Sequence, residues 1–270
     1  MGSHGDFKTI EASRPDFEAN ESFYHTKTVK PDWKVGDGAN DPSWKDHKTV
    51  EIDPYGNGRT SFDNYKLLIS GIIPRPIGFV STVSTDGKYN LAPYSYTQIV
   101  NHDPPIFCIG MSAGRGANKD SCENLLTTKE CTINIISEWF IEAANYTSIN
   151  APHGVSEWGP TGLTQAASTK VAPPRVAESA FSIEAKLIHT HDWFSPSTGA
   201  KTGTLVIVQG INFHVREDAL NEQKNMIDPS VLRPVSRLGG VTYGRTTSGY
   251  ELTRPEFADE KAKEEVKGFL

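Results

Sequence analysis

The sequence predicts a mainly β protein in which about six strands close into an antiparallel barrel, accompanied by short helices. Apolar runs rich in β-branched and aromatic residues recur along the chain, and turn residues separate them. Helical segments are too few to cover both faces of a doubly wound parallel sheet. A closed barrel also leaves no unpaired edge on strands as apolar as these.

The composition limits the classes of function. The chain has 270 residues, 37% of them hydrophobic, which suits one main domain with extensions. The formal net charge is −6 and no block of like charge occurs, so we expect no nucleic-acid partner. The longest apolar runs are far too short to span a bilayer, so we expect no membrane association.

The cysteines and histidines suggest neither disulfides nor a metal site. Cys108, Cys122 and Cys131 form no CxxC pair, and their odd count does not indicate a disulfide framework. We therefore expect a reducing, cytoplasmic location. His189 and His191 share one face of an expected strand, but no third ligand is evident.

The chain divides into three parts by residue composition and hydrophobic periodicity. Residues 1–60 are polar with scattered tryptophans and show no period of 2 or 3.6 residues, which predicts an irregular N-terminal extension. This arm packs on the domain or on a partner subunit, and a partly disordered tail is an equal alternative. Residues 61–250 form the expected domain, and 251–270 a charged C-terminal tail that becomes helical near its end.

The first half of the domain is predicted to form strands joined by tight turns. A run over 72–83 is followed by Asp86-Gly87, a strong hairpin signal, and a second run covers 89–100. Asp103-Pro104-Pro105 then breaks the chain before a third strand at 106–111. Three consecutive short strands indicate a meander.

The second half mixes two short helices with three further strands. Asp120 is a suitable N-cap with Glu123 three residues later, so a helix is expected from there after the loop 112–118. A second short helix is expected over 139–146, and a long surface loop over 147–180 that is a candidate lid or subunit contact. The strands are expected at 131–136, 181–191 and 204–215, and a short helix or turn at 229–238.

The strongest ligand signal is Lys119-Asp120-Ser121 at the expected helix start. Free backbone N–H groups and the helix dipole favour an anion there. Lys119 adds a cation, Ser121 adds a hydroxyl donor, and glycines at 114 and 116 let the backbone approach a ligand. A phosphate is the ligand that such a site suits, and an ordinary capped helix after a flexible loop is the alternative.

A second candidate is the segment from Pro74 to Thr82. Two prolines hold Arg75 in an extended segment, and Ser81 and Thr82 lie on opposite faces of the strand that follows. One hydroxyl must then face the barrel interior or a ligand. The alternative is a surface arginine paired with a carboxylate, beside hydroxyls that are merely tolerated.

A third candidate is the segment from Asn90 to Thr97. Ala92 and Pro93 leave room for a planar ring beside the backbone, and Tyr94, Ser95 and Thr97 can donate hydrogen bonds to it. Alternation places Ser95 and Thr97 on one face of a continuous strand, with the tyrosines on the other. An ordinary strand rich in Tyr and Thr is the alternative.

A fourth candidate is Gly239-Gly240 with Tyr243. The glycines permit close backbone approach, and Tyr243 can stack on a planar ligand. A helix stop is the alternative. Cys122 in the first turn of a helix favours a thiolate, but a small buried side chain is the simpler interpretation.

Taken together, these segments resemble the flavin reductase-like family of FMN-binding split barrels. The matching stretches occur in the family's order: PRPIGFVSTVSTDGKYNLAPYSYTQ, DPPIFCIGM, KDSCENL, CTINII, VAPPRVAES, and RPVSRLGG with Tyr243. The resemblance covers roughly residues 62–245 and implies a six-stranded split barrel. It also implies a homodimer with the flavin, FMN or alternatively FAD, near the interface of two barrels.

The resemblance further implies roles for individual residues. It places three groups of side chains near the flavin: Arg75, Ser81 and Thr82 beside it, Pro93, Tyr94, Ser95 and Thr97 along its ring, and Lys119, Asp120 and Ser121 at its phosphate. Gly239, Gly240 and Tyr243 approach from the C-terminal segment, in the same or the partner subunit.

The leading functional hypothesis is an oxidoreductase that transfers hydride from NADH or NADPH to flavin. No catalytic residue is assigned, because the flavin supplies the reactivity and the protein supplies orientation and hydrogen bonds. Without a Rossmann fingerprint the sequence does not separate NADH from NADPH. A monooxygenase partner that takes reduced flavin is one of the acceptors left open. Two alternatives remain: an enzyme that keeps FMN and acts on its own small organic substrate, and a non-catalytic flavin-binding module.

Overall fold

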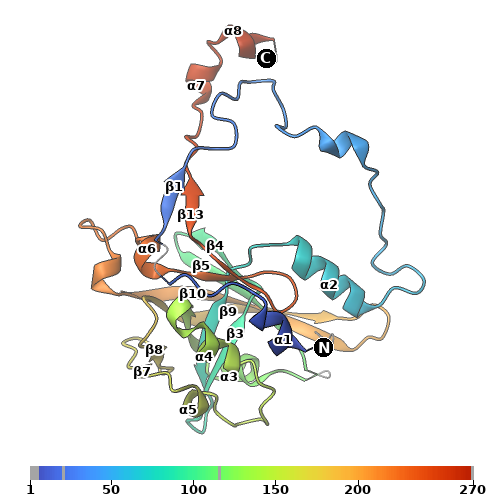
Figure 1. Ribbon diagram of the computed structural model, residues 1–270. Coiled ribbons are helices and arrows are strands. Elements are labelled where there is room, and N and C mark those ends of the chain that lie inside the picture. Colours follow the sequence, from blue (N-terminus) through green and yellow to red (C-terminus); the bar gives the residue numbers. More distant parts are fainter. Residues whose placement is uncertain (1–5, 20–21, 115–116, 269–270) are drawn as a thin grey trace.

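The computed structural model describes residues 6–19, 22–114 and 117–268 (Figure 1). Its helices are α1 (Phe7–Ala12), α2 (Ser61–Gly71), α3 (Asp120–Thr128), α4 (Ile141–Tyr146), α5 (Trp158–Thr161), α6 (Pro229–Leu232), α7 (Phe257–Glu260) and α8 (Glu264–Lys267). Its strands are β1 (Tyr24–Thr26), β2 (Gly78–Val83), β3 (Tyr89–Tyr94), β4 (Thr97–His102), β5 (Pro105–Ser112), β6 (Glu130–Ile135), β7 (Gln165–Ala166), β8 (Arg175–Val176), β9 (Phe181–Phe194), β10 (Lys201–Val215), β11 (Val235–Arg237), β12 (Tyr243–Arg245) and β13 (Ser248–Tyr250).

One antiparallel sheet forms the centre of the molecule, in the strand order β3-β2-β6-β9-β10-β5-β4. The class is therefore mainly β with short helices, as the sequence predicted. β3 and β4 lie at opposite edges of the sheet, although only two residues separate them in the chain. The sheet must curl so that its two edges approach at this corner, but the edges do not pair, and the sheet is not a closed barrel.

The sheet has seven strands rather than the predicted six, because the run over 89–100 divides at Ser95 and Tyr96. The Thr97 hydroxyl donates to the Tyr94 carbonyl oxygen at 2.7 Å and closes this corner. A Cβ on Gly78 would lie 2.8 Å from the Thr97 hydroxyl oxygen, so the corner needs glycine opposite it. The alternation of faces predicted for a continuous strand therefore does not hold from Tyr94 to Thr97.

The segment before β2 also differs from the prediction. The strand expected over 72–83 begins only at Gly78, and residues 72–77 connect it to α2, a helix that was not predicted. Thr60 and Asp63 start this helix with a reciprocal capping box, in which each side chain accepts a hydrogen bond from the other residue's backbone N–H. This places α2 beside Arg75.

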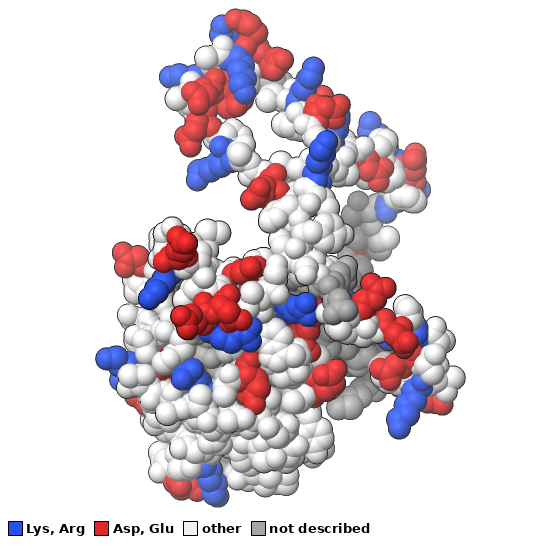
Figure 2. Space-filling view, turned by 60° about the vertical axis from the view of Figure 1, so that its left-hand side comes forward, with Lys and Arg blue, Asp and Glu red and all other residues white. Residues whose placement is uncertain are grey.

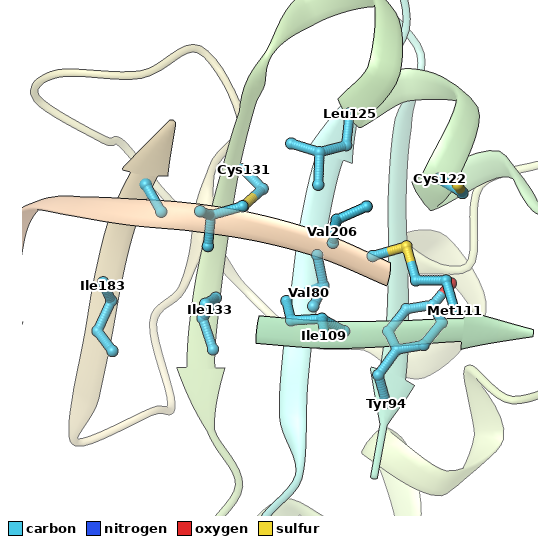
Figure 3. Close-up of a cluster of buried hydrophobic side chains, with 12 residues drawn as sticks. Val80, Tyr94, Ile109, Met111, Cys122, Leu125, Cys131, Ile133, Ile183 and Val206 are labelled. Atoms are coloured by element: carbon cyan, nitrogen blue, oxygen red, sulfur yellow. The ribbon is translucent and has the colours of Figure 1, made fainter. Parts of the chain in front are cut away.

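Two apolar clusters hold the sheet together, one on each face of β2. Successive strand residues point to opposite faces, so Val80 joins the cluster of Figure 3 and Phe79 joins the other. The first cluster includes Leu125 of α3, and the second includes Phe140 and Trp158 beside α4 and α5. Helices therefore cover both faces at the end of the sheet where β3 meets α3.

The N-terminal segment follows the surface and then leaves it. Arg245 lies over the Phe17 ring at 4.3 Å, and Arg233 donates to the Ala19 carbonyl at 2.9 Å. β1 then pairs in parallel with β13, and residues 27–59 run as an exposed arc before α2 (Figure 1). Figure 2 shows Lys and Arg mixed with Asp and Glu over this arm and the C-terminal segment. No helix in the described part of the chain is long and apolar enough to cross a membrane.

The three thiols differ in accessibility, and we predict that they react in a fixed order. Burial raises the pKa of Cys122 and raises that of Cys131 to about 12, whereas Cys108 is only half-buried. A small alkylating reagent at mildly alkaline pH should therefore modify Cys108 first and Cys131 only after unfolding. Mass spectrometry of native and denatured samples measures this. Equal native rates for Cys108 and Cys131 would contradict the packing described here.

Candidate functional site

Two adjoining cavities lie where the corner between β3 and β4 faces the start of α3. The first, the loop cavity, has a volume of about 260 Å³ and is lined by β3, the start of α3 and the loop 147–151. The second, the hairpin cavity, has a volume of about 160 Å³ and is lined by α2, the β3–β4 corner and the turn between β11 and β12. Pro93, Tyr94 and Lys119 line both, so the two cavities meet along these side chains.

Most residues expected at a ligand site from the sequence lie at these cavities. Asp120 and Ser121 line the loop cavity, and Arg75, Ser95 and Gly240 line the hairpin cavity. Thr97 lies in a neighbouring depression that it shares with Arg75 and Ser95. Gly114 lines the loop cavity, and Gly116 is outside the described residues.

Besides Thr97, four of the expected residues line neither cavity. Ser81 and Thr82 are fully buried within β2, where the Thr82 hydroxyl accepts from Asn124 at 3.1 Å. Gly239 packs against Ser70 of α2. Tyr243 lines a separate cavity beneath the N-terminal segment, and the Arg237 guanidinium lies over its ring at 4.4 Å.

Asp120 is not the N-cap that the sequence predicted. The helix begins at Asp120, and its N-cap is Lys119, whose side chain makes no capping bond. The Lys119 ammonium is exposed and forms no ion pair within the described part of the chain. The start of α3 therefore offers free N–H groups and an unpaired cation to the cavities.

Asp120 holds the loop that closes the loop cavity. One carboxylate oxygen contacts His153 Nδ1 at 2.5 Å, and the other accepts from the Gly154 N–H at 2.9 Å. The capping box expected with Glu123 is absent because the Asp120 carboxylate is engaged by this loop instead.

Removal of the Asp120 carboxylate, which holds His153 and Gly154, should loosen this loop. We predict that Asp120→Ala speeds amide exchange at Gly154 by roughly tenfold, because a hydrogen bond to a charged acceptor is lost. His153→Ala is the matched control, since it keeps the Gly154 hydrogen bond, and should have a clearly smaller effect. Hydrogen exchange resolved by mass spectrometry tests this. Equal exchange in wild type and Asp120→Ala would show that the Asp120 carboxylate does not hold the loop.

Arg75 is buried and donates to backbone carbonyls. It does not form the surface ion pair that the sequence left open as an alternative. Its guanidinium donates to the Ile69, Ile72 and Leu238 carbonyls, so it satisfies the end of α2 and fixes the turn after β11. Its Nε is buried and has no acceptor among the described residues, although the side chain lines the hairpin cavity. A ligand that brings an acceptor would satisfy it.

Three neighbouring side chains that the sequence did not single out complete the loop cavity. Asn90 and Glu157 lie on its wall, and Asn118 lies beside Lys119. Burial raises the pKa of the Glu157 carboxyl, and it likewise raises that of the Tyr94 phenol, which stays a proton donor at neutral pH. Asn90 begins the third candidate segment, whereas Glu157 and Asn118 belong to no recognisable motif, and only the length of the 147–180 loop pointed toward Glu157.

Comparison with known proteins identifies the fold and relatives of the chain. The family model of the flavin reductase like domain matches residues 70–233. The structure of nitrilotriacetate monooxygenase component B from Bacillus cereus is 32% identical, with a TM-score of 0.72, covering 76% of this chain and 100% of that one. The 2-nitrobenzoate 2-nitroreductase of Pseudomonas fluorescens is 28% identical, with a TM-score of 0.67, covering 77% and 98%. A split barrel domain from Shewanella frigidimarina, at 22% identity, a TM-score of 0.61 and coverage of 74% and 95%, shares the fold.

Proposed function

Because the chain belongs to the flavin reductase like domain family, we propose that it binds FMN and uses NADH or NADPH to reduce it. FMN occupies the two adjoining cavities, and FAD is the larger alternative. The observation that carries the proposal is Lys119, an unpaired cation at a helix start that lines both cavities.

The side chains present fit this cofactor. Lys119, with the N–H groups at the start of α3, suits a phosphate, and Ser121 lines the same cavity. Pro93 and Tyr94 give the meeting line of the cavities a flat, largely apolar wall for a planar ring. The unsatisfied Nε of Arg75 suits a ring that carries carbonyl oxygens.

The protein's part in the reaction is orientation and charge stabilisation. When bound, FMN supplies the redox chemistry, because it accepts a hydride from a nicotinamide. Arg75 and Tyr94 supply hydrogen-bond donors beside the ring position, which favour negative charge there. Thr97 contributes indirectly, since its hydroxyl is already engaged by the Tyr94 carbonyl and fixes the corner.

The same proposal includes a homodimer with the flavin near its interface. The apolar surface proposed for this interface consists of Leu68 of α2 and Ile72 just after it, which line the depression next to the hairpin cavity, together with exposed Ile99 and Val100 of the edge strand β4. A second copy of the chain that covered this surface would remove an exposed sheet edge. The proposed acceptor of reduced flavin is a monooxygenase partner, in line with the component named in the Bacillus cereus relative.

A second candidate is a flavoprotein that retains FMN and reduces its own small organic substrate. The likeness to a 2-nitrobenzoate 2-nitroreductase favours it. In this case FMN stays bound through gel filtration, and added free flavin is turned over slowly.

The deciding experiment is the visible spectrum of purified protein with FMN under anaerobic conditions, before and after NADH and then NADPH. Rapid loss of the band at about 450 nm supports the reductase and identifies the preferred nicotinamide. Gel filtration of the FMN complex then separates the two candidates. Protein that binds no added FMN would refute the flavin proposal altogether.

A further inference from the structure

Glu157 is a carboxylate in the wall of the loop cavity to which the proposed reaction gives no role. It lies immediately before α5 and is 8% exposed. Burial raises the pKa of this carboxyl. Burying a carboxylate is costly unless hydrogen-bond donors surround it, so its donors need to be accounted for.

One of its two oxygens is satisfied by the protein. Glu157 Oε2 accepts the Leu91 N–H at 3.2 Å, on the unpaired side of the edge strand β3. The Asn90 amide satisfies both of its neighbours when its nitrogen donates to this same oxygen at 3.2 Å and its oxygen accepts from the Ser121 hydroxyl at 2.6 Å. Protein donors therefore converge on Oε2.

Among the hydrogen bonds that other described residues make to this carboxylate, none reaches Oε1, and the remaining backbone donor close to the carboxylate is the N–H of Glu157 itself. The other carboxylate of the cavity, Asp120, differs because His153 and Gly154 engage both of its oxygens. Within the described part of this cavity, Glu157 is thus the carboxylate with acceptor capacity left for a ligand.

The loop cavity is lined by two side chains of opposite charge, Lys119 and Glu157. Lys119 is a cation suited to a phosphate, whereas a carboxylate repels a phosphate and attracts O–H donors. A ligand that satisfies both carries hydroxyl groups next to its phosphate. The sugar-alcohol chain of a flavin nucleotide has this chemistry, since its hydroxyls lie between the ring and the phosphate.

We propose that Glu157 accepts hydrogen bonds through Oε1 from the sugar-alcohol hydroxyls of the flavin, and so selects flavins that carry this chain. This inference rests on the proposed function. It assigns the loop cavity to the sugar-alcohol chain and the phosphate of the flavin, and the wall along Pro93 and Tyr94 to the flavin ring.

Three flavins separate the contributions of the ring, the sugar-alcohol chain and the phosphate to binding. Lumiflavin has the ring alone, riboflavin adds the sugar-alcohol chain, and FMN adds the phosphate. Dissociation constants of all three are measured by quenching of flavin fluorescence, for wild type, Glu157→Gln and Glu157→Ala. Glu157→Gln keeps the shape and an acceptor for Leu91, and Glu142→Gln, an exposed carboxylate on α4, is the control. Melting temperatures check that each variant is folded.

The expected result is selective. Glu157→Gln should weaken riboflavin and FMN alike by roughly fivefold, and Glu157→Ala by roughly tenfold or more, because a charge-assisted hydrogen bond is about twice as strong as a neutral one. Lumiflavin affinity should not change in either variant, and Glu142→Gln should change none of the three.

The outcomes that overturn the inference are distinct from those that overturn the proposed function. Equal losses for lumiflavin and riboflavin would mean that Glu157 only supports the edge of β3, and unchanged affinities would mean that it does not touch the ligand. In both cases the flavin site would stand. If wild type bound none of the three flavins, the proposed function would fail together with this inference.

Discussion

Replacement of Lys119 by alanine is expected to weaken FMN binding roughly tenfold to a hundredfold, the range that a hydrogen bond to a charged group contributes. Riboflavin, which lacks the phosphate, should bind the variant almost as well as it binds wild type. The reason is that Lys119 lines both cavities, forms no ion pair within the described part of the chain, and stands at a helix start. The absorbance shape of bound flavin should change little, because the ring is held by other residues.

Lys129→Ala is the matched control, since this lysine has the same charge and ends the same helix. Titration of both variants with FMN and riboflavin, at low and at moderate salt, measures the effect. The loss of FMN affinity in Lys119→Ala should shrink as salt increases, because screening already weakens the wild-type contact. If Lys119→Ala bound FMN as tightly as wild type does, the phosphate would lie elsewhere.

The parts of the fold that the sequence predicts well are those set by short-range signals. Asp86-Gly87 lies in the turn between β2 and β3, and Pro104 lies between β4 and β5, as turn chemistry requires. α2 was not predicted, although Thr60 and Asp63 stand at the spacing of a capping box. The extra corner at Ser95 was missed because it depends on Gly78, which lies in the neighbouring strand.

The site residues divide in the same way, into those set by short-range signals and those set by long-range contacts. Lys119-Asp120-Ser121 is a local motif, and the structure places it at the cavities. Glu157 lies at the same cavity but comes from a distant part of the chain: its carboxylate accepts from the Leu91 N–H across 66 residues, and Asp120 holds nearby Gly154 across 34 residues. Tyr243 was expected to stack on a ligand, but it pairs in a hairpin with Arg237, which covers its ring instead. Long-range contacts of this kind are not encoded in any window of the sequence.

Another part of the 147–180 segment, between β7 and β8, is held by a buried carboxylate away from the flavin cavities. Glu184 on β9 is fully buried and accepts three consecutive backbone N–H groups, those of residues 169–171. Asn212 and His214 of β10 complete its coordination. Burial by itself raises the pKa of this carboxyl, but the hydrogen bonds from His214, the loop amides and Asn212 outweigh it and lower the pKa to about 2.

Glu184→Gln should therefore cost on the order of 3 kcal/mol of unfolding free energy, because a neutral amide cannot satisfy three converging N–H donors. Glu130→Gln is the control: Glu130 holds the same loop through one N–H, of Ala172, and an exposed pair with Lys186, so it should cost about 1 kcal/mol or less. Since the folded pKa of Glu184 lies below the unfolded value of 4.5, its contribution is complete above pH 4.5 and is lost as the pH falls toward 2. Urea unfolding between pH 7 and pH 3 should then show the gap between wild type and Glu184→Gln narrowing with acid. A gap that stayed constant would mean that the charge of Glu184 does not hold the loop.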